Sequence, residues 1–263
     1  MILEEIAEYA ACRVQESKRQ IPLEIMREKA LSMDAETGFP VEKKLKEPGI
    51  HFICEVKKAS PSKGVIAEHF PYLEIAEEYE KAGASVISCL TEPKYFQGSD
   101  AYLKEIAGKV SIPVLRKDFT VDPYQIYEAK VLGASMVLLI CSLLDTDVIA
   151  EYLSLCDNLG LSALGEVHDE EEMESALKAK ARIIGVNNRN LKDFTVDIHN
   201  STRLRALAPE DKIFVAESGI KTSGDIRELE EAKVNAVLIG ETLMRSKDKS
   251  RMLKMLRGMG EYD

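Results

Sequence analysis

The sequence of 263 residues contains no tryptophan, and only 6% of its residues are aromatic. It also has no long hydrophobic run: the apolar stretch at 136–141 is far shorter than the ~20 residues that a membrane-spanning helix needs. The first residues lack the basic start, long apolar stretch and small-residue cleavage site of a secretory signal. We therefore expect no membrane helix and a cytoplasmic location.

Cysteine is scarce as well. The five cysteines are odd in number and scattered, and none forms a C-x-x-C pair, which argues against a disulfide framework or a zinc site. Cys54, Cys89 and Cys141 lie within apolar strand-like runs, where a reduced thiol packs as a small hydrophobic group. The four histidines lack ligand spacing to acids or thiols, so we expect no metal.

Basic residues are fewer than acidic residues. The chain has 35 Lys and Arg against 45 Asp and Glu, which gives a formal net charge of −10 at pH 7. Such a field repels phosphate backbones and anionic lipids, so neither nucleic acid nor a membrane is an expected partner. A small anionic substrate requires local dipoles and a few well-placed cations.

Short apolar and β-branched runs recur along the chain. They lie at 50–57, 85–90, 114–118, 136–142, 162–167, 183–187, 213–218 and 236–240. Amphipathic stretches with helical spacing separate them, and continuous apolar strands are typical of a parallel sheet covered on both faces. Eight strand-then-helix repeats predict an α/β fold, a closed (β/α)₈ TIM barrel. An open dinucleotide-binding sheet is disfavoured because no G-x-G-x-x-G follows the first strand.

The first 48 residues precede this pattern. Apolar positions from Ile2 to Val14 form a helical stripe, and a second helical segment follows over 23–33. We expect a helical extension that covers the barrel bottom, leans over its mouth or mediates association. No composition shift marks a boundary, so residues 1–263 are predicted to form a single barrel domain that includes the extension.

Polar residues gather where the predicted strands end. Alternate residues of a strand lie on the same side of it, and several polar residues lie on the side expected to point into the barrel. These residues are Glu55, Lys57, Lys117, Glu166, Asn187, Arg189 and Glu217. In a parallel barrel every strand ends at the same mouth, so these side chains are expected to converge there as an active site. A structural ion-pair network is the alternative interpretation. His168, two residues after Glu166, could orient a group at the rim.

Anion binding has separate candidates. Gly219 and Gly240 follow the last two predicted strands, whose loops frequently build the phosphate site of this barrel class. The loop at 60–64, with Lys63, either approaches the same anion or is an ordinary turn.

These residues stand within seven ordered motifs that together cover nearly the whole chain. They lie at 55–64, 90–99, 115–119, 166–168, 185–191, 217–220 and 238–241. With them the chain resembles the indole-3-glycerol phosphate synthase family. The resemblance implies a lyase that closes, decarboxylates and dehydrates 1-(2-carboxyphenylamino)-1-deoxyribulose 5-phosphate without a cofactor.

The resemblance also implies catalytic roles. Lys117 corresponds to the general acid for ring closure, and Lys57 with Glu166 to the acid/base pair for the later loss of hydroxyl and proton. Glu55 would tune Lys57, and Asn187 would help to hold it. Which lysine acts at which step stays open. Partial burial is expected to lower the lysine pKa values toward useful acidity.

The substrate-binding residues are implied in the same way. Phe96, Phe119, Leu138 and Leu191 would form an apolar wall around the anthranilate ring. Arg189 would face the substrate carboxylate with Ser218 nearby, and Glu217 would meet the sugar hydroxyls. The phosphate would bind Ser60, Gly219, Gly240 and the Glu241 backbone, with the Glu241 side chain turned away.

Two other functions fit the same pattern. A strand-end lysine in a dry barrel can also be a nucleophile, so Lys117 or Lys57 could serve a Schiff-base aldolase acting on a sugar phosphate. The second of these alternatives is a barrel subunit without catalytic activity. Retention of both lysines together with Glu166 argues against it.

Overall fold

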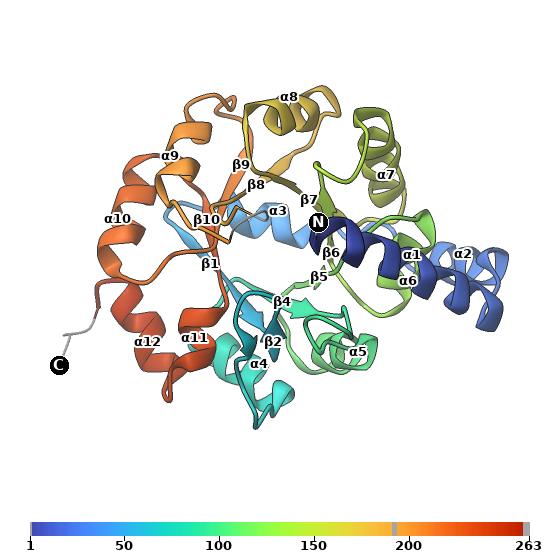
Figure 1. Ribbon diagram of the computed structural model, residues 1–263, viewed down its shortest axis with the longest axis horizontal. Helices are drawn as coiled ribbons and strands as arrows, with labels where there is room; N and C mark the ends of the chain where they lie inside the picture. Colours follow the sequence, from blue (N-terminus) through green and yellow to red (C-terminus); the bar gives the residue numbers. More distant parts are fainter. Residues whose placement is uncertain (1, 191–193, 260–263) are drawn as a thin grey trace.

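The computed structural model describes residues 2–190 and 194–259, and its centre is a closed barrel of eight parallel strands (Figure 1). The barrel strands are β1 (His51–Val56), β4 (Val86–Leu90), β5 (Val114–Lys117), β6 (Met136–Ile140), β7 (Ser162–Val167), β8 (Ile183–Asn187), β9 (Ile213–Glu217) and β10 (Ala236–Ile239). Each pairs with its neighbour in sequence, and β1 closes the ring against β10. The predicted TIM barrel is confirmed. The first and last residues of each strand lie within two residues of the predicted ones.

Helices surround the barrel and connect its strands. They are α4 (Tyr72–Lys81), α5 (Asp100–Lys109), α6 (Pro123–Val131), α7 (Thr146–Asn158), α8 (Glu170–Lys178), α9 (His199–Arg205), α10 (Ser223–Glu231), α11 (Glu241–Arg245) and α12 (Lys249–Leu256). The loop after β1 contains a small antiparallel pair, β2 (Ala59–Ser60) and β3 (Gly64–Val65).

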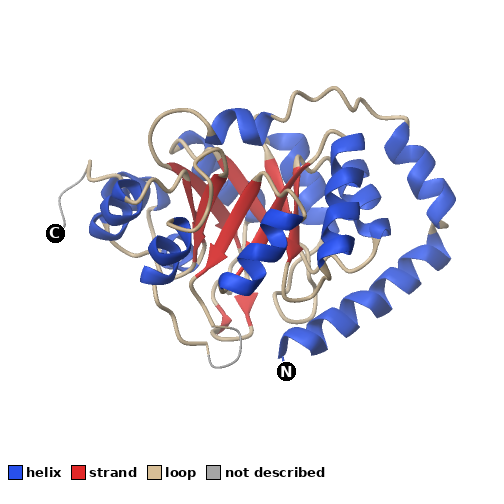
Figure 2. Cartoon of the chain, turned by 90° about the horizontal axis from the view of Figure 1, so that it is seen from above, coloured by secondary structure: helices blue, strands red, loops and turns tan. Residues whose placement is uncertain are grey.

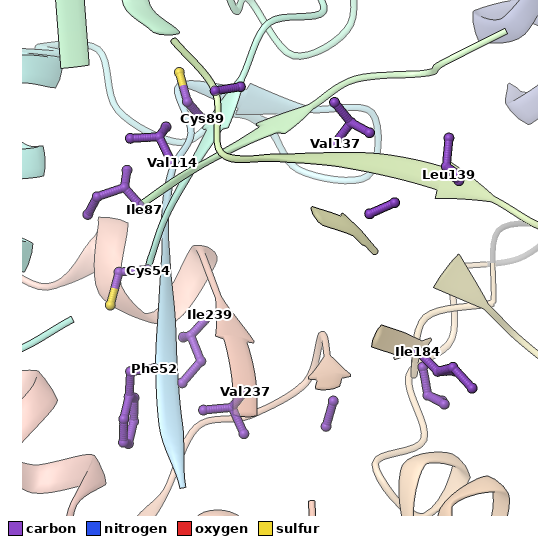
Figure 3. Packing of buried hydrophobic residues seen from close by; sticks show 14 of the residues in the cluster. Phe52, Cys54, Ile87, Cys89, Val114, Val137, Leu139, Ile184, Val237 and Ile239 are labelled. Atoms are coloured by element: carbon purple, nitrogen blue, oxygen red, sulfur yellow. The ribbon is translucent and has the colours of Figure 1, made fainter. Parts of the chain in front are cut away.

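The strands are buried on both faces. Phe52 and Cys54 of β1 point outward into the layer between strands and helices, together with Ile87 and Cys89 of β4 (Figure 3). Ile53 points the other way, into a separate cluster that fills the barrel interior. The predicted core positions of Cys54, Cys89 and Cys141 are confirmed, since all three thiols are buried and free.

The register sets which residues reach the mouth together. Leu90 pairs with Lys117, Ile140 with Glu166, and Asn187 with Glu217. Because adjacent parallel strands are shifted in step around the barrel, the last residues of β5, β7 and β9 arrive at one rim.

The N-terminal extension occupies both ends of the barrel. Helix α1 (Ile2–Gln20) reaches the mouth, where Arg13 forms an ion pair with Asp118 at 2.6 Å. Helix α2 (Leu23–Leu31) packs along α6, and α3 (Pro40–Leu45) closes the bottom with Val41 and Leu45 inside the barrel core. Figure 2 shows the N-terminus on the side toward which the strand arrows point and α3 on the opposite side.

Within the described part of the chain, none of the helices combines the length and apolar character needed to cross a membrane.

Candidate active site

A cavity of about 650 Å³ opens at the carboxyl ends of the strands. Among its lining residues are fifteen that the sequence singled out: Glu55, Lys57, Ser60, Phe96, Lys117, Phe119, Leu138, Glu166, Asn187, Arg189, Glu217, Ser218, Gly219, Gly240 and Glu241. The sixteenth, Leu191, lies outside the described residues. Residues from all eight barrel strands or the loops that follow them therefore share one space.

A buried cluster of charges occupies the floor of this cavity. The Lys117 Nζ lies 2.8 Å from Glu166 Oε2 and 3.1 Å from Glu217 Oε2. Asn187 Nδ2 donates to the other oxygen of Glu166 at 3.3 Å. The sequence interpretation assigned Asn187 to Lys57; its contact is with Glu166 instead, because β7 and β8 are neighbours in the barrel.

Lys57 and Glu55 form a second ion pair on β1 and the residue that follows it. Both side chains point into the cavity, as strand alternation predicted. Gly240, at the end of β10, leaves room for them. A Cβ atom on residue 240 would overlap the Glu55 carboxylate and lie 2.9 Å from Lys57 Nζ.

The pKa of Lys117 is raised, which corrects the expectation that burial would lower it. Burial does disfavour the ammonium form, but the negative charges of Glu166, Glu217 and Glu55 and the hydrogen bond to Glu166 outweigh it. Loss of water alone would lower this pKa, but three carboxylates converge on one nitrogen, and sequence spacing does not reveal their positions. Lys117 is therefore firmly protonated at neutral pH.

The two carboxylates beside Lys117 behave differently. Burial, only partly offset by Lys117, raises the pKa of Glu217 to about 7, and the negative charge of Glu166 adds to this rise. Although burial opposes it, the charges of Lys117 and His168 lower the pKa of Glu166. The cluster thus holds one carboxylate that favours the ionised form and one that holds its proton more tightly than an ordinary carboxyl group.

This arrangement makes a stability prediction. Glu217 binds a proton more tightly in the folded chain than in the unfolded chain, so its stabilising contribution is full below the ordinary carboxyl pKa and is lost as the pH rises through about 7. We expect Glu217→Gln, which removes a buried charge, to raise Tm by about 3 °C or more at pH 8 and by much less at pH 5. Differential scanning calorimetry at both pH values measures this.

Glu174→Gln is the matched control. Glu174 is exposed, and its hydrogen bond to Lys178 lowers its pKa, so its removal should not stabilise the fold at either pH. Equal melting temperatures for Glu217→Gln and the unaltered chain at pH 8 would contradict the assigned burial cost.

One wall of the cavity is apolar. The rings of Phe96 and Phe119 lie 6.2 Å apart between centroids, and Leu138 adds to the same lining. Helix α1 contributes Ile2, Leu3 and Ile6 from above. The sequence reasoning missed these three as site residues, since an apolar stripe predicts a covered face but not the surface that covers it.

Another part of the cavity carries positive charge around Glu241. Arg245 Nε donates to Glu241 Oε1 at 3.0 Å, while Lys63 and Arg189 each lie 3.9 Å from the same carboxylate. Ser60, Gly219 and Gly240 line the space between them. This end can attract an anion despite the negative charge of the whole chain.

Arg189 is held within the loop that follows β8. Its NH1 donates to the Phe194 carbonyl at 3.4 Å, and its backbone N–H donates to Asn187 Oδ1 at 3.1 Å. The Ser218 hydroxyl donates to the same oxygen of Asn187 at 2.9 Å. Asn187 thereby links Arg189 and Ser218 to the Glu166 carboxylate.

The fold and this cavity define a TIM-barrel enzyme with paired lysines and carboxylates beside an anion-attracting end. The family model described as "Indole-3-glycerol phosphate synthase" matches residues 3–256. Similar proteins of that name include one from Ruminiclostridium cellulolyticum, 56% identical over 98% of this chain and 99% of its own length, and one from Endomicrobium trichonymphae, 54% identical over 98% and 100%. The chain belongs to the indole-3-glycerol phosphate synthase family.

Solved structures at low identity share the fold. A 3-hexulose-6-phosphate synthase superimposes with a TM-score of 0.64 at 15% identity and covers 80% of this chain and 99% of its own. KGPDC from Streptococcus mutans does so with a TM-score of 0.62 at 10% identity, covering 80% and 96%. The family membership, rather than this likeness, makes the protein a carboxy-lyase of tryptophan biosynthesis.

Proposed function

We propose that the substrate is 1-(2-carboxyphenylamino)-1-deoxyribulose 5-phosphate and that the residues of the cavity divide its conversion to indole-3-glycerol phosphate among them. The observation that carries this proposal is that Lys117 shares one cavity with an apolar wall and with a group of cations that can attract an anion. An aromatic ring fits the first and a phosphate the second, so the ketone between them would face the ammonium group.

Ring closure is the first step. The ring carbon that bears the carboxylate attacks the ribulose carbonyl carbon, and the carbonyl oxygen takes a proton from Lys117. A raised lysine pKa does not prevent this transfer, because an alkoxide is a far stronger base than an amine. The apolar wall of Phe96 and Phe119 holds the ring close to the carbonyl.

Decarboxylation and dehydration follow. The carbon–carbon bond to the carboxylate breaks, and its electrons restore the aromatic ring as CO₂ leaves. The new hydroxyl leaves as water with a proton from Lys57, and Glu166 takes the proton of the adjacent carbon as the indole double bond forms. The lowered pKa of Glu166 makes it the ionised base of the cluster.

The test uses the purified chain with the proposed substrate and EDTA. We expect indole fluorescence to appear with the release of one CO₂ per indole. A Schiff-base aldolase would instead form an adduct on Lys117 or Lys57 that borohydride traps and mass spectrometry detects. A non-catalytic subunit would give neither signal. Either of these last two outcomes would overturn the proposal.

Arg189 is proposed to bind the substrate carboxylate. We expect Arg189→Ala to raise KM by about tenfold to a hundredfold with a smaller change in kcat, because a charge-assisted hydrogen bond to the substrate is lost. Steady-state fluorescence kinetics measure both constants. Arg203→Ala is the control, since Arg203 of α9 pairs with Glu170 of α8 on the surface of the protein. An unchanged KM for Arg189→Ala would remove Arg189 from this role.

The cytoplasmic location and the absence of a nucleic-acid partner stay predictions from the sequence.

A further inference from the structure

His168 lies at the edge of the catalytic cluster, two residues beyond Glu166. Its Nδ1 is 2.9 Å from Glu172 Oε2, and its backbone N–H donates to the same oxygen at 2.8 Å. Its Nε2 lies 3.6 Å from Glu166 Oε1. The imidazole ring therefore stands between a carboxylate of α8 and the carboxylate assigned as the catalytic base.

The two ring nitrogens have different surroundings. The Glu172 carboxylate accepts a hydrogen bond from Nδ1 of His168, so this nitrogen carries a proton. Within the described residues, Nε2 is buried and has no hydrogen-bond partner. In a neutral ring, Nε2 would direct a lone pair at the Glu166 carboxylate, which is repulsive. In a protonated ring, it directs an N–H at that carboxylate.

We propose that His168, held by Glu172, is a positioning residue that carries a fixed positive charge against Glu166 and keeps this carboxylate ionised and oriented. This inference rests on the proposed role of Glu166 as the base. It gives Glu166 a cation on each side, with Lys117 at Oε2 and His168 facing Oε1.

The charges that face His168 come from four elements. Glu172 lies on α8, Glu166 on β7 and Glu217 on β9, and these three favour the imidazolium, whereas Lys117 on β5 opposes it. Burial lowers the pKa of His168, but the hydrogen bond to Glu172 and the three carboxylates outweigh it, so that its pKa is raised.

Two further neighbours, Cys141 and Asn200, carry no charge. Burial raises the pKa of the nearby Cys141 thiol to about 12, so it carries no charge. Asn200 Nδ2 of α9 donates to the His168 carbonyl at 2.9 Å and holds the loop in place.

A second cation matters at a particular moment of the reaction. Once Lys117 has given its proton to the substrate oxygen, Glu166 loses the charge that lies closest to it. The imidazolium of His168 remains, so Glu166 stays ionised and available for the later proton removal. Without it, Glu166 would be protonated over a wider pH range and unable to act as a base.

The test compares His168→Gln with the unaltered chain in the pH dependence of kcat. We expect the acidic limb to move upward by about 1 pH unit, because an opposite charge close to a carboxylate is removed. At pH values on that limb kcat then falls about tenfold, while KM changes little. Glu172→Gln should move the limb in the same direction.

His199→Gln is the matched control. His199 Nδ1 also lies 2.9 Å from a carboxylate, that of Glu228, but the pair is exposed on the surface. Its pH profile should match that of the unaltered chain. An acidic limb that stays in place in His168→Gln would overturn the proposal.

A second measurement does not depend on catalysis. Carbon-13 NMR of the histidine rings in the full chain gives the pKa of His168, which we expect above 6.5, its ordinary value, and lower in Glu172→Gln. A value at or below 6.5 would overturn the proposal even if His168→Gln did not fold. Failure of the unaltered chain to form indole would instead contradict the proposed function, while the NMR result would still decide the charge on His168.

Discussion

Replacement of Lys117 by alanine is expected to lower kcat by about three orders of magnitude, because general acid catalysis by a positioned side chain contributes roughly 10²- to 10⁴-fold. The carbonyl oxygen would then gain negative charge with no proton donor and no cation beside it. Indole fluorescence at saturating substrate measures this loss. Near-normal turnover would remove Lys117 from the mechanism.

A second variant separates proton donation from charge. Lys117→Ala leaves Glu166 and Glu217 buried without their cation, so its fold must be verified by thermal melting. Lys117→Arg keeps a positive charge there, but a guanidinium gives up its proton far less readily than an ammonium group. We expect kcat to stay at least about a hundredfold low in Lys117→Arg. Recovery by arginine would show that only the charge is needed.

Replacement of Gly240 by alanine is expected to lower kcat by about a hundredfold, since a displacement of about 1 Å in a catalytic group costs that much. The added methyl group would overlap the Glu55 carboxylate and force the Glu55–Lys57 pair to move. The backbone at Gly240 has a φ of −116°, which alanine adopts without strain. The effect is therefore steric and confined to the site.

Gly108→Ala provides the comparison. Gly108 lies within α5, and a Cβ atom there meets no neighbour within 4 Å. Alanine at this helical position should leave kcat unchanged and stabilise the fold by roughly 0.5–1 kcal/mol. If Gly240→Ala kept the kcat of the unaltered chain, the claim that catalysis needs a residue without a side chain next to Lys57 would be wrong.

The barrel was predictable from the sequence because eight continuous apolar runs are separated by helical stretches. The direction of the polar side chains was predictable because successive residues of a strand point to opposite faces. Once Ile53 is assigned to the interior, Glu55 and Lys57 must face the mouth on the same side, and the same rule applies to Lys117 and Glu166. The parallel topology then brings strand ends together. No knowledge of side-chain contacts was needed for these conclusions.

Contacts between strands were not predictable in this way. The pairing of β7 with β8 places Asn187 beside Glu166 instead of Lys57. The raised pKa of Lys117 depends on three carboxylates from three other strands, and sequence spacing gives no distance between them. The closeness of His168 to Glu166 could be inferred from the sequence, but the contact of His168 with Glu172 became evident only in three dimensions.

The extension illustrates a different limit. The apolar stripe of α1 predicted a buried face, yet covering the bottom, leaning over the mouth and association with another chain all satisfy that pattern. The ion pair between Arg13 and Asp118 fixes α1 at the mouth, while Val41 of α3 closes the other end. Charged partners that lie 105 positions apart leave no local signal in the sequence.

A crystal structure with the substrate analogue in which a hydroxyl replaces the reactive ketone tests the proposed geometry most directly. We predict that Lys117 Nζ lies within hydrogen-bond distance of this hydroxyl, with the aromatic ring against Phe96 and Phe119 and the phosphate beside Gly219 and Gly240. An analogue bound with its hydroxyl turned away from Lys117, or with its phosphate at the apolar wall, would contradict the assignment of the general acid and of both ends of the cavity.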